Sequence, residues 1–185
     1  PYDKVFFTQF NKDNYELVFL EIPLNEQTAD FASGANAICV FVNDKITAGV
    51  LEKLSKTTVN IIALRCAGFN NVDLDSAKSN GIRVCRVPAY SPEAVAEHAV
   101  AMLLTLNRKT HKAYNRVREQ NFSLNGLLGY NIHGKTIGII GTGNIGKAFA
   151  KIMLGFGCRV LAFDLIANKD LETLGVEYLP LMEVF

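Results

Sequence analysis

Short apolar runs alternate with helix-like segments over the first half of the chain. Four runs rich in β-branched residues occupy residues 15–21, 36–42, 59–66 and 81–87, and this composition is typical of strands. Consecutive positions within each run are apolar, as in strands that are buried on both faces of a parallel sheet. The pattern therefore predicts a parallel α/β sheet.

The segments between these runs carry helical signals. Val50, Leu51 and Leu54 share one face of residues 47–56, because residues three and four apart lie on the same side of a helix. Asp73 is placed to cap the next helix. Residues 1–13 also show a helical pattern, and because a strand is expected before such a helix, we expect the first strand of this domain to be missing.

A long helix is predicted to begin after Ser91, which suits the N-cap, with Pro92 at the first helical position. Ala, Met and Leu fill nearly all its sides as far as Leu106. This composition predicts a buried helix at a junction between domains, and His98 within it is predicted to be buried and hydrogen-bonded. The Asn and Gly content of residues 121–134 predicts a loop.

A second α/β series begins at Lys135. A strand-like run over 136–141 is followed by apolar residues with helical spacing over 145–156 and by a second strand-like run over 158–164. A further turn of helix and a short strand are predicted near the end of the sequence. This order is that of a parallel sheet with crossover helices.

Gly141, Gly143 and Gly146 stand between the first strand and the helix of this series, with the spacing GxGxxG. The first glycine permits a tight turn, the second lets the backbone approach a pyrophosphate, and the third allows close packing of helix and strand. The N-terminus of the helix then presents N–H groups and partial positive charge to the phosphates. The pattern predicts a dinucleotide-binding loop; the alternative is a glycine turn that binds nothing.

Asp164 ends the second strand of this series. A carboxylate in this position accepts hydrogen bonds from the adenosine ribose hydroxyls and repels a 2′-phosphate. Residues 165–168 include no arginine that could bind such a phosphate. The predicted cofactor is therefore NAD rather than NADP.

Two further loops offer candidate substrate contacts. Ala67 and Gly68 follow a predicted strand, and ligands of open α/β sheets bind at such strand ends, so their backbone N–H groups could meet a carboxylate. Tyr90 precedes the capped helix and could donate a hydrogen bond to a substrate. On spacing alone, an ordinary turn and an amphipathic surface tyrosine are the favoured interpretations.

Composition narrows the class of protein. Hydrophobic residues make up 49% and charged residues 20% of the 185 residues, which favours a folded core over disorder. The net charge is +1, with Lys and Arg spread along the chain, so neither a nucleic-acid nor a membrane partner is expected. The four cysteines form no CxxC pair, and no signal peptide opens the sequence. We therefore expect reduced core cysteines, no metal site and a cytoplasmic location.

Residues 65–108 and 134–164 together resemble the D-specific 2-hydroxyacid dehydrogenase family, most closely its fermentative NAD-dependent D-lactate dehydrogenases. The resemblance implies an α/β fold in which a flavodoxin-like parallel-sheet substrate domain is followed by an incomplete Rossmann dinucleotide-binding domain, with a cleft between the two. It assigns the substrate carboxylate to the backbone of Ala67 and Gly68, and a place in the substrate pocket to Tyr90. The implied cofactor contacts are Gly141, Gly143, Asn144, Ile145, Gly146 and Asp164.

The sequence also departs from the family pattern. The family's catalytic Arg, Glu and His lie downstream of the glycine loop, and no residue here matches them; His98, His111 and His133 lie upstream, and the latter two have polar surroundings typical of the surface. A dinucleotide domain needs two βαβαβ halves, and the sequence has room for about one. We therefore expect no catalytic residue in this chain, and a fragment of a longer enzyme that is inactive by itself.

The resemblance implies three regions: a substrate domain lacking its first strand over 1–90, inter-domain helices and a loop over 91–134, and the first part of an NAD-binding domain over 135–185. The expected parent reaction is NADH-dependent reduction of pyruvate to D-lactate, by a homo-oligomer in the full-length form. Two alternatives stay open: a dehydrogenase for another D-2-hydroxy acid, and an NAD-sensing, non-catalytic protein like the corepressors that resemble this family. A reading frame that stops at Phe185 would favour the second.

Overall fold

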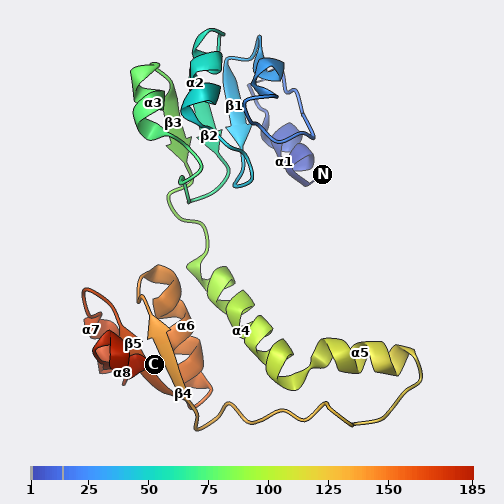
Figure 1. The fold of residues 1–185 in the computed structure, drawn as a ribbon, viewed down its shortest axis with the longest axis vertical. Coiled ribbons are helices and arrows are strands. Elements are labelled where there is room, and N and C mark those ends of the chain that lie inside the picture. Colours follow the sequence, from blue (N-terminus) through green and yellow to red (C-terminus); the bar gives the residue numbers. More distant parts are fainter. Residues whose placement is uncertain (1, 14) are drawn as a thin grey trace. The chain divides into compact units, whose positions relative to one another are not determined.

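The computed structural model describes residues 2–13 and 15–185. The chain divides into two compact units, Pro1–Tyr90 and Ser91–Phe185, and each unit holds a three-stranded parallel sheet (Figure 1). The predicted α/β class is therefore confirmed. The finer division into three regions, with residues 91–134 between domains, stays a prediction.

The first unit is built on a sheet in the order β1-β2-β3. Its elements are α1 (Tyr2–Phe10), the 3-10 helix η1 (Ala29–Ala32), β1 (Ala37–Val40), α2 (Ala48–Ser55), β2 (Ile61–Leu64), α3 (Leu74–Ser79) and β3 (Arg83–Arg86). The predicted caps are confirmed at α3, where the Asp73 carboxylate accepts a hydrogen bond from the N–H of Ser76 over 2.9 Å. The predicted apolar face of α2 is also confirmed, because Val50, Leu51 and Leu54 are fully buried in the core of this unit.

The strand predicted over residues 15–21 is wrong. These residues form neither helix nor strand, and they are largely exposed, with 70% of Tyr15 and 74% of Val18 accessible. A strand is stabilised by its hydrogen bonds to a neighbouring strand, and β1 pairs with β2 rather than with this segment. The helix predicted over 1–13 is observed as α1; Pro1 lies outside the described residues.

The second unit is built on a sheet in the order β4-β5-β6. Its elements are α4 (Pro92–Arg108), α5 (Thr110–Arg118), β4 (Thr136–Ile140), α6 (Asn144–Gly155), β5 (Arg159–Phe163), α7 (Lys169–Thr173), β6 (Glu177–Tyr178) and α8 (Leu181–Val184). The strands run parallel and are joined by α6 and α7, which is the βαβαβ arrangement of one half of a Rossmann sheet. A separate core that includes Met153, Val160 and Leu171 lies in this unit.

The helix predicted to begin after Ser91 is observed as α4, and Lys109, which has a positive φ of 52°, separates it from α5. Ser91 caps α4 as predicted, accepting a hydrogen bond from the N–H of Ala94 over 3.1 Å. The predicted burial of this helix is wrong, because its buried residues are Ala96 and Val100: an apolar sequence shows what a helix can bury, not what covers it.

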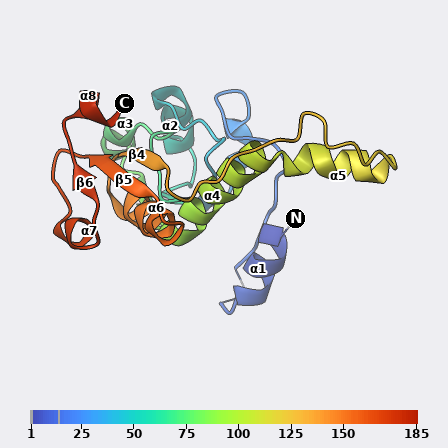
Figure 2. The same ribbon diagram turned by 90° about the horizontal axis from the view of Figure 1, so that it is seen from below.

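The loop predicted over 121–134 is confirmed, and in Figure 2 it runs back beside α5 toward β4. Hydrogen bonds hold it there, since Lys109 Nζ donates to the carbonyl of Gly126 over 2.9 Å and Arg116 Nη1 to that of Asn125 over 2.6 Å. Over residues 2–13 and 15–185, the helices are too short or too polar to cross a membrane. Of the cysteines predicted to lie in the core, Cys66 and Cys158 are buried, whereas Cys39 and Cys85 are exposed.

Candidate functional site

The glycine loop joins β4 to α6 in a tight turn. Gly141 has a φ of +90°, a conformation that residues with a side chain rarely adopt. Gly146 lies in the first turn of α6, where a Cβ atom would overlap the carbonyl oxygen of Gly141. The conformation of the loop therefore requires glycine at both positions. The two glycines bring the start of α6 close against the end of β4.

The N-terminus of α6 is open to a ligand. The first residues of the helix, Asn144 and Ile145, are exposed. Gly143 occupies the N-cap and has no side chain that could cap the helix. The N–H of Lys147 is the first to bond within the helix, to the carbonyl of Gly143 over 2.8 Å. The N–H groups before it therefore point out of the helix end, where the helix dipole favours negative charge.

Asp164 follows β5 and turns back onto the glycine loop. Its Oδ2 accepts a hydrogen bond from the N–H of Thr142 over 2.6 Å and another from the Thr142 hydroxyl over 3.0 Å. These bonds hold the pKa of the Asp164 carboxyl below its usual range, and the bond from the backbone N–H has the larger effect. They lower the pKa because they stabilise the charged form. An ionised carboxylate thus stands beside the turn that precedes α6.

The candidate substrate turn follows β2 in the first unit. Ala67 is half-buried and Gly68 is exposed, and among the described residues neither N–H donates a hydrogen bond within the protein. The thiol of buried Cys66 lies 3.2 Å from the carbonyl oxygen of Gly68, which holds the turn from within. Two adjacent N–H groups are therefore available to an anion.

Arg86, the last residue of β3, links this turn to the next loop. Its Nη1 donates to the carbonyl of Ala67 over 3.0 Å and to that of Pro88 over 3.2 Å. Its guanidinium also lies over the ring of Phe69, 5.3 Å from the ring centre. Tyr90 lies at the end of the second loop and is 69% exposed.

The three histidines are all exposed, so the prediction that His98 is buried is wrong, whereas the predicted surface positions of His111 and His133 are confirmed. His133 Nδ1 lies 3.1 Å from the carbonyl oxygen of Phe156, a structural contact at the start of β4. Arg65, the first residue after β2, forms an ion pair with Asp3 over 2.6 Å. None of the three histidines lies in the glycine loop or the substrate turn.

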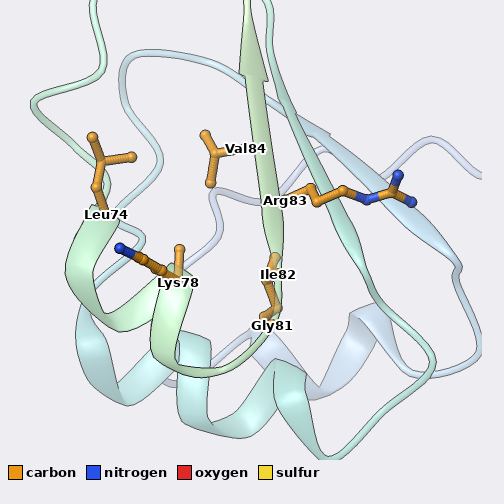
Figure 3. Close-up of a pocket in the computed structure, with 7 residues that line it drawn as sticks. Leu74, Lys78, Gly81, Ile82, Arg83 and Val84 are labelled. Atoms are coloured by element: carbon orange, nitrogen blue, oxygen red, sulfur yellow. The ribbon is translucent and has the colours of Figure 1, made fainter.

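A shallow cavity of about 370 Å³ lies elsewhere, between α3 and β3. Figure 3 shows Val84 pointing toward α3, with Leu74 and Lys78 on the helix, while Arg83 points to the other side of the strand. The cavity is lined from the start of β3, whereas ligands of parallel sheets bind at the carboxyl ends of the strands. It therefore has no part in either candidate site.

Three residues in these sites were not found from the sequence: Thr142, Tyr178 and Arg86. Tyr178 of β6 lies 36 positions from Thr142, and their hydroxyl oxygens are 2.8 Å apart. No local spacing marks such a pair. Arg86 precedes the predicted loop of Tyr90, but its bond joins the end of β3 to Ala67 in the turn after β2 and has no local signal either.

Comparison with known proteins gives a family match over residues 1–143, to the D-isomer specific 2-hydroxyacid dehydrogenase, catalytic domain. The chain is 55% identical over 185 residues to a D-lactate dehydrogenase of Escherichia coli (strain K12), covering 100% of this chain and 56% of that protein. The chain thus spans about half the length of the curated relatives it matches.

Solved structures agree with this match. The apo-structure of D-lactate dehydrogenase from Escherichia coli has a TM-score of 0.91 and 55% identity, covering 100% of this chain and 58% of that one. D-lactate dehydrogenase from Aquifex aeolicus, complexed with NAD and lactic acid, has a TM-score of 0.80 and 36% identity, covering 99% of this chain and 54% of that one.

Proposed function

The chain belongs to the D-isomer specific 2-hydroxyacid dehydrogenase family, and we propose that it supplies the substrate turn and the NAD-binding loop of a D-lactate dehydrogenase. The observation that carries the proposal is the ionised Asp164 carboxylate, bonded to the glycine loop beside the open N-terminus of α6. The likeness to D-lactate dehydrogenases supports the choice of substrate.

The glycine loop fits a dinucleotide. A Cβ atom on Gly143 would meet nothing within 4 Å, so the backbone there is open to close approach by a phosphate. The N–H groups of Asn144 and Ile145 are the proposed pyrophosphate donors, and Asp164 the acceptor for the adenosine ribose hydroxyls. Because that carboxylate is charged, it disfavours a 2′-phosphate, and NAD rather than NADP is the proposed cofactor.

The turn after β2 fits a small carboxylate. The N–H groups of Ala67 and Gly68 are the proposed donors to the carboxylate of pyruvate or D-lactate, and the Tyr90 hydroxyl is a proposed contact of the same substrate. Charge-assisted hydrogen bonds from backbone N–H groups to a carboxylate are short and strong. These groups bind and orient the substrate; the catalytic Arg, Glu and His of the family have no match in this sequence.

In the proposed reaction, pyruvate, NADH and a proton give D-lactate and NAD. When bound, NADH supplies the hydride, which adds to the keto carbon, while an acid supplies the proton to the keto oxygen. The residues of this chain take no part in the proton transfer. They hold the cofactor and the carboxylate, and we expect the 185-residue chain alone to bind NAD without turnover.

The test is the oxidation of NADH by the complete gene product in the presence of pyruvate, followed by chiral analysis of the lactate. D-lactate formation that depends on both reactants is the expected result. Strong preference for a bulkier 2-keto acid would reassign the substrate. Absence of turnover with every 2-keto acid would contradict the dehydrogenase and favour a non-catalytic NAD-binding protein.

A further inference from the structure

Thr142, in the glycine loop, is a polar residue that the fold buries, with 4% of its surface exposed. Its N–H and its hydroxyl both contact Asp164 Oδ2, at 2.6 and 3.0 Å, and the hydroxyl of Tyr178 lies 2.8 Å from Thr142 Oγ1. A buried hydroxyl needs hydrogen-bond partners, and here both partners come from other elements of the same sheet.

The direction of each bond follows from the number of protons. A threonine hydroxyl has a single proton, and an ionised carboxylate can only accept. Thr142 therefore donates to Asp164, and Tyr178 donates to Thr142. The result is a chain of hydrogen bonds with a defined direction, from the Tyr178 phenol through Thr142 to Oδ2 of Asp164.

The two carboxylate oxygens of Asp164 are consequently not equivalent. Oδ2 accepts two short hydrogen bonds from Thr142. Oδ1 accepts one long hydrogen bond, from the N–H of Ile166 over 3.5 Å, and a carboxylate oxygen can accept more than one. Oδ1 therefore keeps its capacity to accept hydrogen bonds from a ligand.

We propose that Thr142 and Tyr178 are positioning residues for the cofactor, which hold Oδ2 of Asp164 against the glycine loop and leave Oδ1 for the adenosine ribose hydroxyls of NAD. The inference rests on the proposed NAD-binding function and adds to it the two residues that orient the ribose acceptor. A carboxylate that is already fixed loses little conformational freedom when the ribose binds.

The sheet gives this arrangement its rigidity. Thr142 follows β4, Asp164 follows β5, and Tyr178 ends β6, so each of the three strands contributes one group. Tyr178 is paired in register with Ala162 of β5, which sets its distance from the end of that strand. Loss of the Tyr178 hydroxyl would free the Thr142 hydroxyl to rotate away from Oδ2.

A cycle that combines protein variants with ligand analogues tests the proposal. Isothermal titration calorimetry on the 185-residue chain would measure the dissociation constants of NAD and of an NAD analogue that lacks both hydroxyls of the adenosine ribose. Tyr178→Phe should weaken NAD binding about three- to tenfold, the usual effect of one lost hydrogen bond, and leave the analogue's affinity unchanged. Tyr114→Phe, at a tyrosine of α5 that is 61% exposed, is the matched control and should change neither.

A second pair of variants gives a test that does not depend on the folding of Tyr178→Phe. Thr142→Ser keeps the hydroxyl and should retain the difference between NAD and the analogue, whereas Thr142→Val lacks it and should reduce this difference. Equal losses for both ligands, or no loss for NAD, would overturn the positioning role while the wild-type chain still bound NAD. If the wild-type chain alone does not bind NAD, the same cycle is measured on the complete gene product, and failure of that protein to bind NAD would overturn the proposed function and this inference together.

Discussion

Arg86 donates a hydrogen bond from Nη1 to the carbonyl oxygen of Ala67 over 3.0 Å. The carbonyl of Ala67 and the N–H of Gly68 belong to one planar, trans peptide unit, so they point in opposite directions. By holding the carbonyl, Arg86 also fixes the direction of the Gly68 N–H, the proposed donor to the substrate carboxylate. Its second bond, to the carbonyl of Pro88 over 3.2 Å, extends this control to the loop that leads to Tyr90.

Replacement of Arg86 with Met is expected to raise the KM for pyruvate in the complete gene product. The variant keeps an apolar stem of similar reach and removes both hydrogen bonds, so the peptide unit of Gly68 loses its fixed orientation. We expect an increase of about five- to tenfold, with little change in the KM for NADH. Steady-state kinetics with each reactant varied in turn measures both constants.

Arg83→Met is the matched control, because Arg83 is an exposed residue of the same strand, and Figure 3 shows its side chain pointing to the side of β3 away from α3. It should leave both KM values unchanged. An equal rise in the KM for pyruvate in the two variants would show a general effect of surface charge and contradict the role of the Arg86 hydrogen bonds.

Two glycines of α6 are expected to respond oppositely to alanine. Gly146→Ala places a Cβ atom against the carbonyl of Gly141, so the helix must shift away from β4, at a cost of about 1–3 kcal/mol in the free energy of unfolding. Gly155→Ala meets nothing within 4 Å and should be neutral or stabilise by up to about 1 kcal/mol. Denaturant unfolding of the 185-residue chain measures both.

The affinity for NAD is the second quantity to measure in the Gly146→Ala and Gly155→Ala variants. Gly146→Ala should weaken it strongly, because the shift of α6 moves the N–H groups of Asn144 and Ile145, whereas Gly155→Ala should leave it intact. Normal NAD affinity in Gly146→Ala would mean that close packing at this position is not needed for the loop to bind.

Local features of this fold can be predicted from the sequence, whereas features that depend on residues far apart in the chain cannot. The caps by Asp73 and Ser91, the apolar face of α2 and the glycine loop were predictable, because each depends on residues within a few positions of one another. The strand expected over 15–21 is not formed, since strand formation requires a partner that the residues themselves do not specify. The predicted burial of α4 is wrong for a similar reason, because the sequence of a helix does not specify which residues cover it.

The hydrogen-bonded groups around the sites are also long-range. Tyr178, Thr142 and Asp164 meet only because β4, β5 and β6 are neighbours in the sheet. Arg86, at the end of β3, reaches Ala67 in the turn after the neighbouring strand β2. A family motif identifies the residues that contact a ligand, whereas the residues that orient them depend on the three-dimensional neighbourhood.

Asp164→Asn is expected to change the choice of cofactor. The amide oxygen of Asn can still accept the hydrogen bond from the N–H of Thr142, so the loop should keep its shape, but the negative charge that opposes a 2′-phosphate is lost. We expect about tenfold weaker binding of NAD and little change or a gain for NADP, measured by titration of the 185-residue chain with each cofactor. Glu172→Gln, at an exposed carboxylate of α7, is the control; an equal effect there would indicate bulk charge rather than a specific site.

Acid is expected to weaken the second unit. The pKa of Asp164 is lowered by its hydrogen bonds to Thr142, that of Asp170 by Lys147, and that of Glu177 by Arg159. A carboxyl whose pKa is lower in the folded than in the unfolded state stabilises the fold fully above its unfolded pKa, about 3.9 for aspartate, and this stabilisation is lost as the pH falls through the folded value. Stability of the second unit should therefore decline below about pH 4.

The effect of the Thr142 hydroxyl on the pKa of Asp164 can be tested by a pH titration. Carboxyl carbon chemical shifts, followed by NMR against pH, should show the Asp164 midpoint moving upward in Thr142→Val, because the hydroxyl that stabilises the charged form is gone. The shift should be partial, since the N–H of Thr142 remains bonded to Oδ2. Thr173→Val removes a hydroxyl that bonds to Lys169 in α7 and should leave the midpoint in place. An unchanged midpoint in Thr142→Val would mean that the backbone bond alone holds Asp164 ionised, and that Tyr178 has no path through Thr142 to the carboxylate.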